Sequence, residues 1–89
     1  MIIINGICFP EHSEAIILEP RECHSPAIID YDKERDVAIY SERLFLMSLM
    51  VCQGFTYHEA IEWYTYNTLG TSLRKYPVFI TEDGDEALW

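Results

Sequence analysis

Metal-ligating side chains gather near the N-terminus of this 89-residue chain. They are Cys8, His12, Cys23 and His24. A tetrahedral zinc site takes such ligands, and small zinc sites usually draw two of them from one turn through CxxC or HxxxH spacing. Neither spacing occurs in the sequence, and small cysteines are more often buried apolar residues. We therefore expect no bound metal, and a small metal-binding protein remains an alternative interpretation.

Nucleophilic catalysis would need a thiolate, a base and an orienting acid. The candidates are Cys52, His58 and either Glu59 or Glu62. Cys52 ends an apolar run, where burial would raise the pKa of its thiol, and His58 falls in the exposed first turn of a predicted helix. Nucleotide-binding and hydrolase motifs do not occur in the sequence. We expect no catalytic residue and no cofactor.

Carboxylates provide the main candidate for a binding surface. The chain has 15 Asp and Glu against 6 Lys and Arg, which gives a formal net charge of −9. This excess argues against direct binding to nucleic-acid phosphates or to anionic membranes, both of which need clustered Lys and Arg. The acids are concentrated in residues 1–40 and 77–89, whereas residues 41–76 are neutral. The favoured partner is therefore cationic.

The predicted partner-binding residues come from two acidic segments and one exposed ring. They are Asp30, Asp32, Glu34, Asp36, Tyr66, Glu82, Asp83, Asp85 and Glu86. Asp30 and Asp32 share one side of an extended segment, and Tyr66 lies off the apolar stripe of its helix. Spaced negative charges suit a protein that blocks a basic nucleic-acid channel. The alternative is a solvated surface whose charges only keep the protein in solution.

Short β-branched runs in the first half of the chain predict strands. These runs are Ile2–Ile4, Ala15–Leu18, Ala27–Ile29 and Val37–Tyr40. Because the polar segment between the last two runs is short, residues 28–31 and 37–40 are expected to form an antiparallel hairpin. A proline-led run, Pro77–Ile80, predicts a last strand.

Two helices are predicted in the middle of the chain. Ser41 is a typical N-cap for an apolar helix that continues through Cys52 to Gly54. Thr56–Glu59 fits a capping box, and the helix that it opens is expected to run to Leu69 and stop at Gly70. Only three residues, 53–55, join the helices, so we expect them to lie antiparallel.

These elements predict an α+β fold in which a small antiparallel sheet of four to five strands packs against a two-helix antiparallel hairpin. Residues 1–80 would form the single domain, and residues 81–89 an acidic C-terminal tail. The first helix is apolar on more than one face, around Leu46 and Met50. A homodimer built on this apolar surface, with a structural or adaptor role, is an alternative interpretation.

The sequence also indicates a compartment. Its first residues lack the basic region of a secretory signal. No apolar stretch approaches the roughly 20 residues that cross a bilayer. The three cysteines cannot all pair within one chain and none forms a CxxC motif, so reduced thiols and a cytoplasmic location are expected.

The second predicted helix carries a family resemblance. Residues 54–70, GFTYHEAIEWYTYNTLG, with SPAIIDYD at 25–32 and PVFI at 77–80, resemble a group of small phage and prophage proteins. The resemblance covers residues 25–80 and departs at Asp30, where glycine is expected, and in the unusually apolar first helix. It implies a phage or mobile-element origin and carries over no catalytic residue. Small acidic phage proteins commonly act on host defence or nucleic-acid enzymes, anti-CRISPR proteins among them.

The leading hypothesis joins the charge to this resemblance. We expect a noncatalytic, anti-CRISPR-like inhibitor that works in the host cytoplasm. Its partner would be a host protein or ribonucleoprotein complex with a basic surface, and it would bind neither nucleic acid nor a membrane directly.

Overall fold

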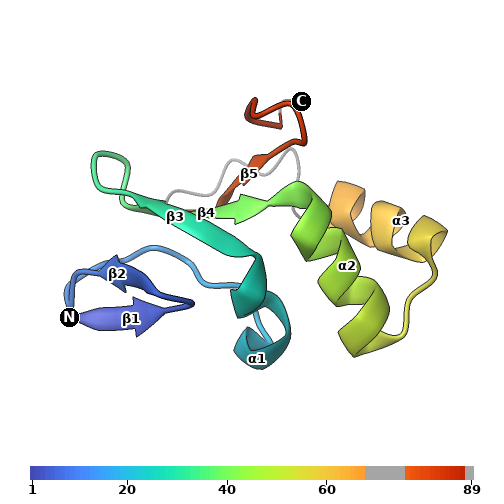
Figure 1. Cartoon of the computed structure of the whole chain (residues 1–89), viewed down its shortest axis with the longest axis horizontal. Helices are drawn as coiled ribbons and strands as arrows, with labels where there is room; N and C mark the ends of the chain where they lie inside the picture. Colours follow the sequence, from blue (N-terminus) through green and yellow to red (C-terminus); the bar gives the residue numbers. More distant parts are fainter. Residues whose placement is uncertain (68–75, 88–89) are drawn as a thin grey trace.

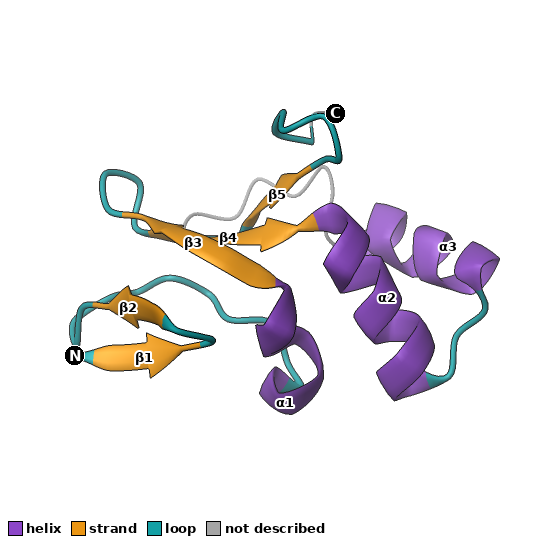
Figure 2. Cartoon of the chain, viewed as in Figure 1, coloured by secondary structure: helices purple, strands orange, loops and turns teal. Residues whose placement is uncertain are grey.

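The computed structural model describes residues 1–67 and 76–87, and it has the predicted α+β class. In chain order the elements are β1 (Ile2–Ile4), β2 (Ile7–Phe9), α1 (Arg21–His24), the 3₁₀ turn η1 (Ser25–Ala27), β3 (Ile28–Asp32), β4 (Val37–Ser41), α2 (Glu42–Gln53), α3 (Tyr57–Asn67) and β5 (Val78–Ile80). The β1–β2 hairpin and the pair α2 and α3 lie toward opposite ends of the long axis (Figures 1 and 2).

The N-terminal hairpin turns at Asn5 and Gly6, whose φ angles of 50° and 79° are both positive. Positive φ at both central residues is typical of the type I′ turn, for which Asn-Gly is the preferred pair. Ile2–Ile4 is a strand as predicted, and it pairs with β2 so that Ile4 faces Ile7 across the ladder. The sequence reasoning missed β2.

The predicted strand Ala15–Leu18 is wrong, because these residues form a loop. Two backbone N–H groups of this loop donate to side-chain hydroxyls and not to the carbonyls of a neighbouring strand. The backbone N–H of Leu18 donates to the Tyr40 hydroxyl at 3.0 Å, and that of Ala15 donates to the Ser13 hydroxyl at 3.2 Å. An apolar run can therefore be buried, as Leu18 is, without joining a sheet.

The strands form two sheets, which corrects the expectation of one antiparallel sheet. β3 and β4 form the predicted antiparallel hairpin, with Asp32 opposite Val37. β5 instead runs parallel to β4, with Tyr40 opposite Phe79. The physical reason is the connection: a long crossover, here containing α2 and α3, lets the next strand run in the same direction as the one before it.

Both predicted helix starts are confirmed. The Ser41 hydroxyl accepts a hydrogen bond from the Leu44 N–H at 3.2 Å, and α2 ends at Gly54 in the left-handed conformation with φ of 74°. In the capping box, the Thr56 N–H donates to the Glu59 carboxylate at 2.9 Å and the Glu59 N–H donates to the Thr56 hydroxyl at 3.1 Å. α3 packs against α2. Its predicted end at Leu69 and Gly70 lies outside the described residues.

The core is built around the ring of Phe45, which is fully buried on α2. The centroids of rings from four other elements lie within 6.0 Å of its ring centroid, namely those of His24, Tyr40, Trp63, Tyr64 and Phe79. Leu46, expected to contribute apolar surface for a dimer, is also buried, with 8% of its surface exposed. The exposed apolar side chains of α2 are instead Leu44, Met47 and Val51.

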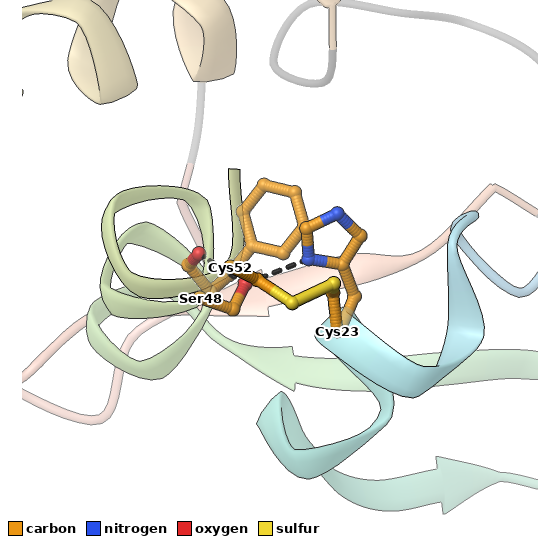
Figure 3. The surroundings of a disulfide bond; sticks show 5 residues. Cys23, Ser48 and Cys52 are labelled. Carbon is orange, nitrogen blue, oxygen red and sulfur yellow. Dashed lines mark hydrogen bonds between the residues drawn. A yellow bond between two sulfur atoms is a disulfide. The ribbon is translucent and has the colours of Figure 1, made fainter. Parts of the chain in front are cut away.

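A disulfide joins Cys23 on α1 to Cys52 near the end of α2, 29 residues apart in the chain (Figure 3). The expectation of reduced thiols is therefore wrong for these two cysteines, and Cys8 is free and exposed. Cys52 was also expected to be buried, yet it is exposed. Their pairing depends on the 5.7 Å approach of the two Cα atoms, which the spacing of cysteines in a sequence does not reveal.

The C-terminal segment folds back on the sheet instead of trailing from it. The Thr81 N–H donates to the Asp85 carbonyl at 2.8 Å, the Ala87 N–H donates to the Phe79 carbonyl at 2.8 Å, and Ile80 bridges to Glu86. Residues 81–85 thus form a turn, which we call the C-terminal turn. In the part of the chain that is described, no helix has the length and apolar character needed to cross a membrane.

Candidate partner-binding surface

The loop between β3 and β4 is organised by Asp32. Its Oδ1 accepts hydrogen bonds from the backbone N–H groups of Glu34 at 2.9 Å and Arg35 at 3.1 Å. Its Oδ2 accepts from the Arg35 Nε at 2.6 Å. These bonds, the Arg35 side chain above all, lower the pKa of the Asp32 carboxyl. The charge of Asp32, whose side chain is 21% exposed, therefore serves mainly to hold the loop together.

Arg35 also joins this loop to the C-terminal segment. Its Nη1 and Nη2 donate to the two carboxylate oxygens of Glu86 at 3.2 and 3.0 Å. The hydrogen bonds to Glu86, and next those to Asp32, raise the pKa of the Arg35 guanidinium above its ordinary value. Two acidic segments that lie 51 residues apart in the chain are thus held side by side.

Asp36 has an internal structural role that the sequence did not indicate. Its carboxylate accepts hydrogen bonds from the Ser13 hydroxyl at 2.6 Å, the Glu14 N–H at 2.9 Å and the Tyr31 hydroxyl. The last bond is the main cause of a raised pKa for Tyr31. Asp36 is half-buried, so it fastens the N-terminal loop to the hairpin and presents little charge to a partner.

The remaining predicted acids lie exposed in three places. Asp30 is on the edge strand β3, Glu34 is in the β3–β4 loop, and Asp83 and Asp85 are in the C-terminal turn. Glu82 lies 3.8 Å from the Arg43 Nε, and both side chains are more than half exposed. We use the term acidic surface for Asp30, Asp32, Glu34, Glu82, Asp83, Asp85 and Glu86. Glu34, Asp83 and Asp85 form no ion pair with another described residue.

Tyr66 is exposed as predicted, with 87% of its surface accessible. It lines a shallow hollow on α3 with Phe55, Glu59, Glu62, Trp63 and Asn67. No residue of the acidic surface lines this hollow. The structure therefore does not bring Tyr66 together with the acids.

The candidate metal ligands are not assembled into a site. Among the residues that the structure describes, no three His, Cys, Asp or Glu side chains are placed to hold a metal ion. Cys23 is in the disulfide, and His24 is fully buried with its Nδ1 2.7 Å from the Ser48 hydroxyl (Figure 3). The disulfide also removes the Cys52 thiolate that the nucleophile hypothesis required, and His58 pairs with Glu62 at 2.7 Å.

Sequence reasoning missed a groove beside α2, with a volume of about 510 Å³. It is lined by Glu42, Arg43, Leu46, Met47, Met50, Tyr57, Thr81, Glu82 and Asp83. The two methionines stand in an apolar run, but only the folding back of the C-terminal turn makes a second wall. The molecule thus places exposed carboxylates beside a groove that is lined by both apolar and charged side chains. The chain matches no family model, no curated protein and no solved structure.

Proposed function

We propose that this chain is a noncatalytic binding protein that docks its acidic surface on the basic surface of a host protein or ribonucleoprotein that handles nucleic acid. The observation that carries the proposal is the double contact of Arg35 with Asp32 and Glu86. It unites two acidic segments while leaving other carboxylates exposed. Charge of one sign gathered on one surface speeds encounter with an oppositely charged partner and selects against other partners.

The resemblance of residues 25–80 to small phage proteins supports a narrower form of this proposal. A phage protein of this kind would act in the host cytoplasm as an anti-CRISPR-like inhibitor. Its carboxylates would occupy the positions where a basic cleft receives phosphates, so that nucleic acid and this chain compete for one surface. No catalytic residue is required for such inhibition.

The electrostatic step is tested with a fluorescent peptide of alternating Arg and Ser as the cationic probe. A Glu34→Gln, Asp83→Asn double variant is compared with a control double variant, Glu22→Gln, Glu62→Gln, which removes the same charge from exposed positions elsewhere. At low salt we expect about a tenfold loss of affinity for the first variant and little change for the control. Equal behaviour of the two variants would contradict docking through the acidic surface.

The biological step is tested by phage infection. Expression of the chain in bacteria with an active CRISPR–Cas system should raise the plating efficiency of a targeted phage above that of an empty vector. The acidic-surface double variant should lose this protection, whereas the control double variant keeps it. If a panel of CRISPR–Cas types shows no protection, the anti-CRISPR form of the proposal fails, and the binding experiment judges the broader form.

A homodimer is the second candidate, and the exposed side chains of α2 favour it. Leu44, Met47 and Val51 are spaced three and four residues apart, so they lie on one helical face. Leu44, Met47 and Val51 also line an apolar hollow with Pro26 beside the disulfide. Light scattering at high protein concentration should show twice the monomer mass if this face is an interface, and a Leu44→Ser, Val51→Ser variant should be monomeric. A monomeric wild type excludes the interface.

A further inference from the structure

The groove between α2 and the C-terminal turn is lined by apolar and by charged side chains. We call the apolar ones, Leu46, Met47, Met50 and Tyr57, its floor, and the charged ones, Glu42, Arg43, Glu82 and Asp83, its rim. We propose that it receives a basic amphipathic segment of the partner, with an Arg side chain at the rim and a neighbouring large apolar side chain on the floor. This inference rests on the proposed function and names the chemistry of the segment that the partner inserts. The groove has a volume of about 510 Å³, which is in the range of sites that hold a few side chains.

The floor is formed by apolar side chains that the fold leaves partly open. Leu46 is buried and Met50 half-buried, while Met47 and Tyr57 are 46% and 62% exposed. Methionine is unbranched and polarisable, so two of them can adapt to side chains of different shape. Tyr57 adds an aromatic face on which an aliphatic side chain or a guanidinium can pack. An apolar group seated here would remove exposed apolar area from water on both sides.

The rim determines the sign of the occupant's charge. Three carboxylates, those of Glu42, Glu82 and Asp83, line the groove against one guanidinium, that of Arg43, so the charged lining has a net negative charge. Glu42 is held in place because it accepts a hydrogen bond from the Tyr64 hydroxyl at 2.8 Å. Arg43 and Glu82 are 3.8 Å apart and both well exposed, so their pair contributes little stability and can exchange for a partner's guanidinium.

This combination selects among possible occupants. Phosphate-bearing ligands are disfavoured by the excess of carboxylates, and a purely apolar segment would take those carboxylates out of water without supplying a cation. A basic segment that carries no apolar side chain would leave Met47 and Tyr57 exposed. Only a segment with both chemistries satisfies floor and rim together.

The experiment uses the isotope-labelled methyl groups of the three methionines, which report on the groove directly. Met47 and Met50 line it, whereas Met1 lies at the opposite end of the molecule, on the β1–β2 side (Figure 1). The probe is a short peptide of alternating Arg and Leu. Control peptides replace Leu by Ser or Arg by Gln. The Arg-Leu peptide should shift the Met47 and Met50 signals and leave Met1 unchanged, and each control peptide should bind at least about fivefold more weakly.

Matched variants then locate the contact. Met47→Ser in the groove is compared with Val51→Ser, an exposed position one turn away, and Asp83→Asn is compared with Glu62→Gln. We expect Met47→Ser to weaken the Arg-Leu peptide about fivefold and the Arg-Ser peptide hardly at all. Asp83→Asn should weaken both peptides. Neither control variant should change the affinity.

The outcomes separate this inference from the function on which it rests. If salt-sensitive binding of the Arg-Ser peptide depends on Glu34 and Asp83 while the Met47 variant and the methyl signals show nothing, the groove inference fails and electrostatic docking stands. If no basic peptide binds, both fail. Methyl shifts that appear with protein concentration in the absence of peptide would identify a second copy as the occupant and overturn the inference.

Discussion

Arg35 in the β3–β4 loop donates hydrogen bonds to both oxygens of the Glu86 carboxylate, at 3.2 and 3.0 Å, although the two residues are 51 positions apart in the chain. A planar guanidinium that makes two parallel hydrogen bonds fixes direction as well as distance. The same guanidinium holds Asp32 through its Nε. Arg35 therefore links the β3–β4 loop directly to the C-terminal segment, in addition to the backbone hydrogen bonds that fold this segment back on β5.

Replacement of Arg35 by Gln should free the C-terminal segment from the loop with only a small loss of global stability. The side chain is about half exposed, so we expect a loss of about 1 kcal/mol or less in urea unfolding. Hydrogen exchange should be faster at the Thr81 and Ala87 amides, whose bonds close the turn. Lys33→Gln, which removes a neighbouring exposed charge, is the control, and protection equal to wild type in both variants would contradict the role of Arg35.

Asp36→Asn should be more damaging than Asp30→Asn, although both remove one carboxylate. Asp36 accepts three hydrogen bonds from the N-terminal loop and Tyr31, and removing its charge weakens each of them. Asn tolerates the left-handed φ of 53° at this position, so backbone strain does not complicate the comparison. We expect Asp36→Asn to cost about 1–3 kcal/mol in the free energy of unfolding. Equal stabilities of the two variants would show that the hydrogen bonds of Asp36 do not stabilise the fold.

Acidification should destabilise the protein through His24. The Ser48 hydroxyl donates to the Phe45 carbonyl at 2.6 Å, so it accepts from the His24 Nδ1–H, and the buried Nε2 has no hydrogen-bond partner among the described residues. Burial lowers the pKa of His24, so the unfolded chain takes up the proton first. The effect of His24 on the free energy of unfolding is absent well above the ordinary histidine pKa of about 6.5. As the pH falls below that value, the preferential protonation of the unfolded chain destabilises the folded protein increasingly.

Urea unfolding at about pH 7.5 and about pH 5.5 measures this effect in a window above most carboxyl titration. Relative to wild type, His24→Gln should lose much of the difference between the two pH values, whatever its own stability. His58→Gln, at an exposed histidine, should keep the difference. A wild-type stability that does not change across this window would contradict the prediction.

Reduction of the Cys23–Cys52 bond should lower stability by about 3–4 kcal/mol, the chain-entropy value for a closed loop of this length. The bond fastens the four-residue α1 to the last turn of α2, and α1 is too short to hold its conformation alone. Urea midpoints with and without dithiothreitol measure the effect. Cys8→Ser should respond as wild type does, and Cys23→Ser, Cys52→Ser should be insensitive to the reductant. An unchanged wild-type midpoint on verified reduction would refute the stabilising role.

Local chemistry made α2 and α3 predictable, whereas the four-residue α1 was not predicted. The Ser41 cap, the Thr56–Glu59 box and the Gly54 stop each depend on residues within five positions of one another, and each lies where the sequence placed it. The Asn5–Gly6 turn carries an equally local signal, and it would have revealed β2. The exposure of Tyr66 was also predictable, because this residue lies off the apolar stripe of its helix.

Contacts between distant residues were not predictable in the same way. The parallel pairing of Tyr40 with Phe79, the disulfide and the Arg35–Glu86 contact join segments that only the finished fold brings together. The acidic residues could be named from the sequence, but their structural or solvent-exposed roles could not. An internal carboxylate such as Asp36 and an exposed one such as Glu34 look alike in sequence. The groove depends on the same long-range return of the chain.

The parallel placement of β5 has a consequence for the order of folding. β3, β4 and α2 are contiguous and can assemble early, whereas β5 must close a long loop before it gains any contact with β4. One wall of the groove and four of the seven carboxylates of the acidic surface follow β5 in the chain. During synthesis these parts therefore take shape only after the residues that follow β5 have left the ribosome. A nascent or partly unfolded chain has no complete docking face, and recognition is thereby coupled to the completion of folding.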